Sequence, residues 1–220
     1  MADRKAAGPR VLVLGWLTDL SGSIAAALER GGITAKHAHP PGTHLPIRSR
    51  WLTAGPEELS LSAAEIDSID SVIAILEGPT MRIRFGGRHN WASRRQLRRY
   101  ANEACASTTR AALTVGARRT LLICDARRLP PGRRAIALRW TRDLAYRIGY
   151  ECVVNGLPGH AASYAVIDTD DDVRDVADAI VTWQQGTAAD DRRRRWPLHP
   201  VLGSAEVMPA SSRPHRTPPS

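Results

Sequence analysis

The chain has 220 residues, a length that favours one domain with flanking segments over two full domains. With 43% hydrophobic and 24% charged residues, the composition is typical of a globular protein and excludes fibrous, collagen-like and wholly disordered proteins. The formal net charge is +9, and apart from Lys5 and Lys36 the basic residues are arginines. Such an excess fits phosphate recognition by guanidinium groups, but it also fits the codon bias of a GC-rich genome. Charge alone therefore does not decide the function.

The cysteines and the apolar runs indicate the cellular compartment and whether the chain binds a metal or crosses a membrane. Cys105, Cys124 and Cys152 are too few and too widely spaced for a disulfide framework or a paired-cysteine metal site. Residues 1–10 hold no apolar signal segment, and no apolar run approaches the roughly 20 residues that span a bilayer. We expect a cytoplasmic protein with no bound metal and no membrane partner.

Short apolar runs alternate with helical segments along most of the chain. The runs predict strands at 11–15, 33–38, 46–52 (the weakest), 69–76, 120–124 and 150–154. Helices are expected after the first strand, from Pro56-Glu57-Glu58 toward the strand at 69–76, and at 90–115, 132–148 and 171–183. This alternation predicts an α/β fold, a doubly wound, Rossmann-like parallel sheet of about six strands with helices on both faces.

The predicted elements and the change in composition after residue 185 give the predicted domain boundaries. Residues 10–185 form the Rossmann-like domain and residues 1–9 a short N-terminal tail. Residues 186–220 are rich in proline and arginine, including the run Arg192 to Arg195, and are predicted to be a disordered tail.

The turn after the first strand is where a doubly wound protein usually holds a pyrophosphate. Here it runs from Gly15 to Gly22, and it resembles the Gly-x-x-Gly-x-x-Gly turn of the short-chain dehydrogenase/reductases. Thr18 and Ser21 stand at the positions of the second and third glycines. Since the second glycine lets the backbone approach phosphate, Thr18 is expected to weaken or reshape dinucleotide binding, and the charge of Asp19 opposes phosphate as well.

Three later segments resemble the extended or atypical, epimerase/dehydratase-like branch of that superfamily. They are the strand at 69–76, the helix and strand from Asn102 to Ile123, and the helix Asp172 to Ile180, and with the first turn they span roughly residues 10–185. The resemblance implies an NAD(P) site made by Gly15, Thr18, Leu20, Ser21, Gly22, Lys36 and His37. No acidic residue follows the second strand, so the resemblance implies NADP or no cofactor.

The catalytic signature of that family is missing. Its enzymes use a tyrosine and, four residues later, a lysine, and both lysines of this chain precede residue 37. Cys124 and Asp125 stand where the family has its serine pair, and Asn102 lies within one residue of the family's helix asparagine. These three residues are the catalytic candidates. The alternative is that Cys124 is a packing residue and Asp125 caps the next turn.

Two further groups of residues bear on partners. Arg94, Arg95, Arg98 and Arg99 recur on one side of the predicted helix at 90–115. This stripe is either a solvated face or a contact for nucleic-acid phosphate, and the resemblance implies a homodimer through the same helix. His37, His39 and His44 lack a fourth metal ligand, so they are interpreted as incidental loop residues.

Three functions remain open from the sequence. The first is a catalytically degenerate pseudoenzyme that binds a nucleotide or a partner. The second is an NAD(P)-dependent enzyme with a non-standard site at Cys124, Asp125 and Asn102. The third is a nucleic-acid-binding protein that uses the arginine stripe.

Overall fold

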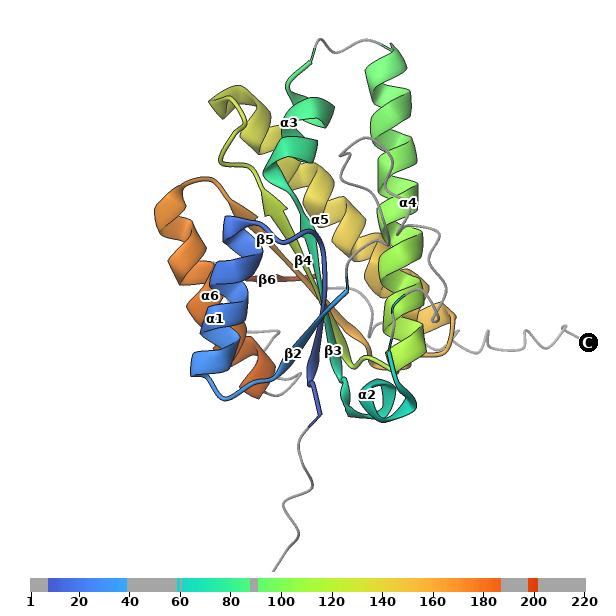
Figure 1. Ribbon diagram of the computed structural model, residues 1–220. Helices are drawn as coiled ribbons and strands as arrows, with labels where there is room; N and C mark the ends of the chain where they lie inside the picture. The colour runs from blue at the N-terminus through green and yellow to red at the C-terminus, as the bar shows by residue number, and fades with distance from the viewer. Residues whose placement is uncertain (1–7, 39–58, 60, 88–90, 187–197, 202–220) are drawn as a thin grey trace, which may run out of the picture.

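The computed structural model describes residues 8–38, 59, 61–87, 91–186 and 198–201 (Figure 1). It has a six-stranded sheet in the order β2-β1-β3-β4-β5-β6. The first five strands are parallel, and β6 (His199–Pro200) runs antiparallel to β5. Their bounds are β1 Val11–Leu14, β2 Ala35–Ala38, β3 Ser71–Leu76, β4 Arg119–Asp125 and β5 Ala161–Ile167. The predicted doubly wound α/β sheet is thus confirmed.

Strand order locates the crevice where such folds bind ligands. The first strand lies between β2 and β3, so the winding direction reverses there, and the switch point lies between β1 and β3. The order β2-β1-β3-β4-β5 over the described strands is that of flavodoxin-like sheets. The strand predicted at 46–52 lies outside the described residues.

Helices cover both faces of the sheet (Figure 1). The first layer consists of α1 (Asp19–Arg30) and α6 (Asp170–Gln185), and the second of α3 (Gly78–Phe85), α4 (Trp91–Val115) and α5 (Pro131–Val154). The short helix α2 (Ala63–Ser68) precedes β3. Alternate strand residues face opposite layers: Val11 and Val13 pack with α1 and α6, and Leu12 and Leu14 with the second layer.

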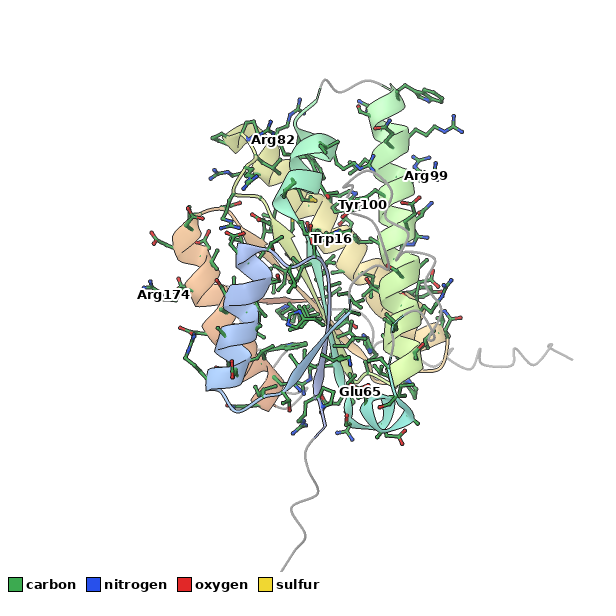
Figure 2. The ribbon with its side chains drawn as sticks, viewed as in Figure 1. Trp16, Glu65, Arg82, Arg99, Tyr100 and Arg174 are labelled. Atoms are coloured by element: carbon green, nitrogen blue, oxygen red, sulfur yellow. The ribbon has the colours of Figure 1, made fainter. Side chains whose placement is uncertain are left out.

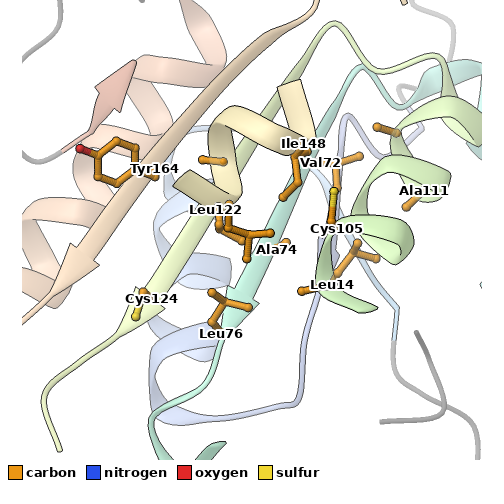
Figure 3. Packing of buried hydrophobic residues seen from close by; sticks show 14 of the residues in the cluster. Leu14, Val72, Ala74, Leu76, Cys105, Ala111, Leu122, Cys124, Ile148 and Tyr164 are labelled. Carbon is orange, nitrogen blue, oxygen red and sulfur yellow. The ribbon is translucent and has the colours of Figure 1, made fainter. Parts of the chain in front are cut away.

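Each layer has its own buried core. Leu20, Ile24 and Trp183 fill the space between α1, α6 and the sheet. On the other face the cluster contains Leu122 and Cys124 of β4 together with residues of α4 and α5 (Figure 3). The sheet is therefore buried on both faces, which explains why its strands are continuous apolar runs.

One predicted strand is wrong, and the structure adds two elements that were not predicted. The strand predicted at 150–154 is wrong, because these residues are the last turns of α5. Gly149 stands directly before them, but a single glycine does not end this long helix, which stops only at Asn155 and Gly156, whose φ is +115°. The next strand is β5, which the sequence did not indicate because four of the residues in His160–Ile167 are alanine or serine. The structure also adds α3, a helix that begins at Gly78 and Pro79.

Part of the predicted tail belongs to the sheet. Leu198 is buried, and His199 stacks on Tyr164 at the edge strand. The expectation of disorder from residue 186 onward therefore does not hold for 198–201, and the rest of that segment lies outside the described residues. None of the described helices is both long enough and apolar enough to cross a membrane.

Candidate functional site

The carboxyl ends of four parallel strands meet at one edge of the sheet. The loops after β1, β3 and β5 bring Trp16, Glu77 and Asp168 to this edge, and Asp125 reaches it as the last residue of β4. Trp16 and Glu77 flank the switch point between β1 and β3, and the Trp16 backbone N–H donates a hydrogen bond to Glu77 Oε1. This carboxyl edge is the candidate site, since doubly wound folds bind ligands there.

The first turn is closed by its own side chains. Thr18 and Ser21 form a reciprocal capping box: the Ser21 N–H donates to Thr18 Oγ1 at 3.3 Å, and the Thr18 N–H donates to Ser21 Oγ at 2.7 Å. The Gly22 N–H donates to the Thr18 carbonyl at 2.9 Å. Three N–H groups at the start of α1 therefore already have protein acceptors.

A carboxylate also occupies the start of α1. Asp19 is its first residue, and Arg127 donates to Asp19 Oδ2 at 2.8 Å. Hydrogen bonding to Arg127 lowers the pKa of Asp19, and the Leu20 N–H contributes in the same direction. The negative charge that a helix N-terminus attracts is thus supplied by the chain itself.

Arg127 is the centre of an ion-pair network at the carboxyl edge. Its guanidinium binds both oxygens of Asp125 at 3.0 and 2.9 Å, and it also binds Asp19 and Asp170. These bonds raise the pKa of Arg127, and only 15% of its side chain is exposed. The loops after β1, β4 and β5 are therefore tied together by one arginine.

Glu77 is half-buried beside this network. Burial raises the pKa of Glu77 to about 7, with a further contribution from the charge of Asp125 and an opposing one from the Trp16 N–H. The next residue, Gly78, brings the backbone close to the Asp125 carboxylate, because a Cβ at this position would lie 2.8 Å from Asp125 Oδ2. Glu77 is thus a carboxyl group poised to exchange a proton near neutral pH at the switch point.

Asp168 is a second perturbed carboxyl group. It follows β5, burial raises its pKa, and its Oδ1 is buried without a hydrogen-bond partner among the described residues. Among those residues no three His, Cys, Asp or Glu side chains gather as a metal site. His39 and His44 lie outside them.

The structure does not bring the three catalytic candidates together. Cys124 is fully buried in the second-layer core, and this burial raises the pKa of its thiol to about 12 (Figure 3). Such a thiol is not a nucleophile at neutral pH. Asp125 reaches the carboxyl edge, where Arg127 binds it. Asn102 lies in a groove of about 340 Å³ between α4 and α5 and accepts a hydrogen bond from Arg147; the groove lining includes neither Cys124 nor Asp125.

The residues predicted to bind a cofactor divide into two groups. The first group, at the carboxyl edge, is Gly15, Thr18, Ser21 and Gly22. Gly15 packs closely on β3, because a Cβ at this position would lie 3.2 Å from the Cβ of Ile75. Leu20 belongs to the core under α1.

The second group lies on β2. Lys36 and His37 are strand residues opposite Leu12 and Val13, and Lys36 binds Glu65 of α2 at 2.8 Å. The Lys36 ammonium is therefore committed to α2 and does not reach the first turn. Lys36 lowers the pKa of Glu65 to about 2, helped by the Ser62 N–H.

A larger cavity opens at the opposite, amino edge of the sheet, with a volume of about 760 Å³. Its polar lining is bonded internally: Asp70 accepts from Arg10 at 2.5 Å and from Gln184 at 2.7 Å. His160 lies between Thr120 and the Ala117 carbonyl, at 2.9 Å from each. These contacts join the amino ends of β3, β4 and β5 and fit a structural role.

Sequence reasoning missed Arg127, Asp168 and Asp170. Asp125 and Arg127 stand two residues apart directly after a strand, which is a signal for a strand-end ion pair. Asp168 and Asp170 follow the end of β5. Because this strand was not predicted, the sequence did not place them at a strand end.

Comparison of the chain with family models, curated proteins and solved structures found no match. The likeness to short-chain dehydrogenase/reductases is therefore a prediction from sequence motifs alone.

Proposed function

We propose that this chain is a binding protein on a Rossmann-like scaffold, a degenerate relative of the atypical short-chain dehydrogenase/reductases that has lost their redox chemistry. One observation carries this proposal: the start of α1, where a pyrophosphate would bind, is filled by the Thr18–Ser21 capping box and by the Asp19 carboxylate.

Two further observations support it. The Tyr-x-x-x-Lys pair is missing from the sequence. The thiol of Cys124, which stands at the serine position, is buried and protonated at neutral pH. Without an acid/base pair or a nucleophile at these positions, the edge lacks the groups that the family's reaction needs.

Titration with NADPH and NADH tests the proposal. We expect no saturable change in cofactor fluorescence up to millimolar concentrations. A double variant, Thr18→Gly with Asp19→Asn, removes the side-chain cap and the charge, and it is expected to bind cofactor more tightly than the wild type. A wild-type Kd below about 1 mM would contradict the closed turn.

Glu77 favours a second candidate, an acid/base enzyme with a non-standard site. A carboxyl group with a pKa of about 7 at the switch point is suited to proton transfer. Hydrolysis of a generic activated ester, measured for the wild type and for Glu77→Gln, tests this candidate. A rate that falls more than about tenfold in the variant and rises with pH through 7 in the wild type favours catalysis, and equal rates exclude this role for Glu77.

A further inference from the structure

The second helical layer is strongly basic. Helices α3, α4 and α5 carry twelve arginines and no lysine, and their acidic residues are Glu103, Asp143 and Glu151. Two of these acids pair with an arginine of their own helix, Glu103 with Arg99 and Asp143 with Arg142, and Glu151 accepts a hydrogen bond from Asn155, which follows the end of α5. On these helices arginines outnumber carboxylates by four to one.

The basic residues gather near the carboxyl edge. The first turns of α4 extend past the ends of the strands on one side of α3, and the start of α5 lies on the other side of α3 (Figure 1). We call the exposed arginines here the arginine face: Arg82, Arg94, Arg95, Arg98, Arg99 and Arg139. Figure 2 shows Arg82 and Arg99 projecting outward from α3 and α4.

The arginine face also exposes large apolar and aromatic side chains. Trp91 is 73% exposed, and the Arg95 guanidinium lies 5.5 Å from its ring centre. Ile83 on α3 and Leu138 on α5 are exposed at 59% and 41%. Tryptophan and arginine are both enriched at interaction surfaces, so an exposed tryptophan beside several arginines favours such a surface.

Charge decides which partner this surface fits. Two copies that met through the arginine face would set arginine against arginine, which costs free energy in a twofold interface. A chain of phosphates is complementary to it. Arg94 and Arg95 lie one helical turn before Arg98 and Arg99, a rise of about 6 Å, so adjacent turns can follow a single backbone.

We propose that the arginine face binds single-stranded nucleic acid, with the arginines on the phosphate backbone and Trp91 as a stacking platform for a base. Basic surfaces that track a strand and aromatic rings that stack on its bases are the two parts of sequence-tolerant single-strand binding. This inference rests on the proposed function only in treating the chain as a binding protein, and it uses a surface separate from the first turn of α1.

Fluorescence anisotropy with the full-length chain and a labelled oligo-dT tests the inference. At physiological salt we expect a Kd of about 1–100 µM, weakening as salt is added. The double variant Arg95→Glu with Arg98→Glu is expected to weaken binding at least about tenfold, and to reduce the slope of log affinity against log salt by about 1.4.

A matched control comes from the first layer. Arg30→Glu with Arg174→Glu changes the net charge of the chain by the same amount, and both side chains are exposed on the other face of the molecule. We expect this pair to change affinity less than about twofold. Equal weakening by both pairs would overturn the inference, since it would mean attraction by net charge alone.

Two further measurements complete the test. Trp91→Ala is expected to weaken oligo-dT binding at least about fivefold, and it should not weaken binding of a duplex of equal charge. Tighter binding of the duplex, or equal competition by poly-glutamate, would overturn the assignment to single-stranded nucleic acid. If the wild-type chain binds no oligonucleotide and the NADPH titration still shows no cofactor binding, this inference is refuted and the proposed function is not.

Discussion

The two helical layers differ in how their charges are arranged. Helices α1 and α6 carry seven acidic residues against Arg30 and Arg174, whereas α3, α4 and α5 carry twelve arginines against three acidic residues. In Figure 2, Arg174 projects from the first layer and Arg99 from the second, on opposite sides of the molecule. At the carboxyl edge two acids of the first layer, Asp19 and Asp170, bind Arg127, which joins the loops there. The proposed nucleic-acid contact depends on the repeated charges of one sign on the second layer.

The largest expected loss of stability comes from changes in the two cores. Trp183 is fully buried between α6 and the sheet, so Trp183→Ala is expected to lower the free energy of unfolding by about 3–5 kcal/mol. Trp140, which stacks on Tyr100 in the second layer, is only partly buried, and Trp140→Ala is expected to cost about 2–3 kcal/mol. Urea unfolding of both variants measures the two costs. An equal or reversed order would contradict the difference in burial between the two tryptophans.

The second effect concerns ion pairs. Arg127→Ala leaves Asp125 buried without its partner and is expected to destabilise the fold by about 2–3 kcal/mol. The matched change in the open layer is Arg99→Ala, which removes an ion pair with Glu103 at an 82% exposed side chain, and we expect less than about 0.5 kcal/mol. Thermal and urea unfolding distinguish the two. A small cost for Arg127→Ala would mean that the network does not hold the edge closed.

Glu77 gives the closed edge a pH dependence. Its pKa is about 7 in the folded chain against an ordinary value of 4.5, so between these values the folded state binds more protons than the unfolded state. Stability from this group is therefore fully present below pH 4.5 and decreases as the pH rises toward 7.

After allowing for partial solvent screening, we expect this loss to be about 2 kcal/mol. Glu77→Gln keeps an acceptor for the Trp16 N–H and removes the titration, so its free energy of unfolding should fall less between pH 4.5 and 7 than that of the wild type. Parallel pH profiles for the two proteins would show that Glu77 titrates normally.

The smallest expected effect on stability is at the helix N-termini. In the first layer Thr169 caps α6 through a reciprocal capping box with Asp172, and Thr169→Ala is expected to cost about 1 kcal/mol. In the second layer Pro130 precedes α5 without any side-chain cap, and Pro130→Ala should change stability by less than about 0.5 kcal/mol. Equal costs from urea unfolding would show that the capping box adds nothing.

Prediction from the sequence was strongest where burial produces a continuous pattern. The strands at 11–14, 71–76 and 119–125 are buried on both faces, so their apolar runs were visible, and the long helix at 91–115 showed its length through the lack of glycine and proline. It was weakest at α5, where the apolar end of a long helix looked like a strand, and at β5, whose small residues hid it.

The candidate site was only partly predictable. The altered first turn and the missing lysine follow from residue identity, and so does the arginine stripe. That Asp125, Asp19 and Asp170 share Arg127 does not, because these residues are separated by up to 151 positions in the chain and meet only when β1, β4 and β5 are paired in one sheet.

By itself, the sequence determined the alternating α/β pattern, the excess of arginine and the absence of a Tyr-x-x-x-Lys pair, since each depends on which residues are present and how far apart they lie. Tertiary structure alone decided which charges neutralise one another. Ion pairing depends on distances across the sheet, so the fold brought Asp19 of α1 and Asp170 of α6 to Arg127 and left the arginine face of α3, α4 and α5 exposed.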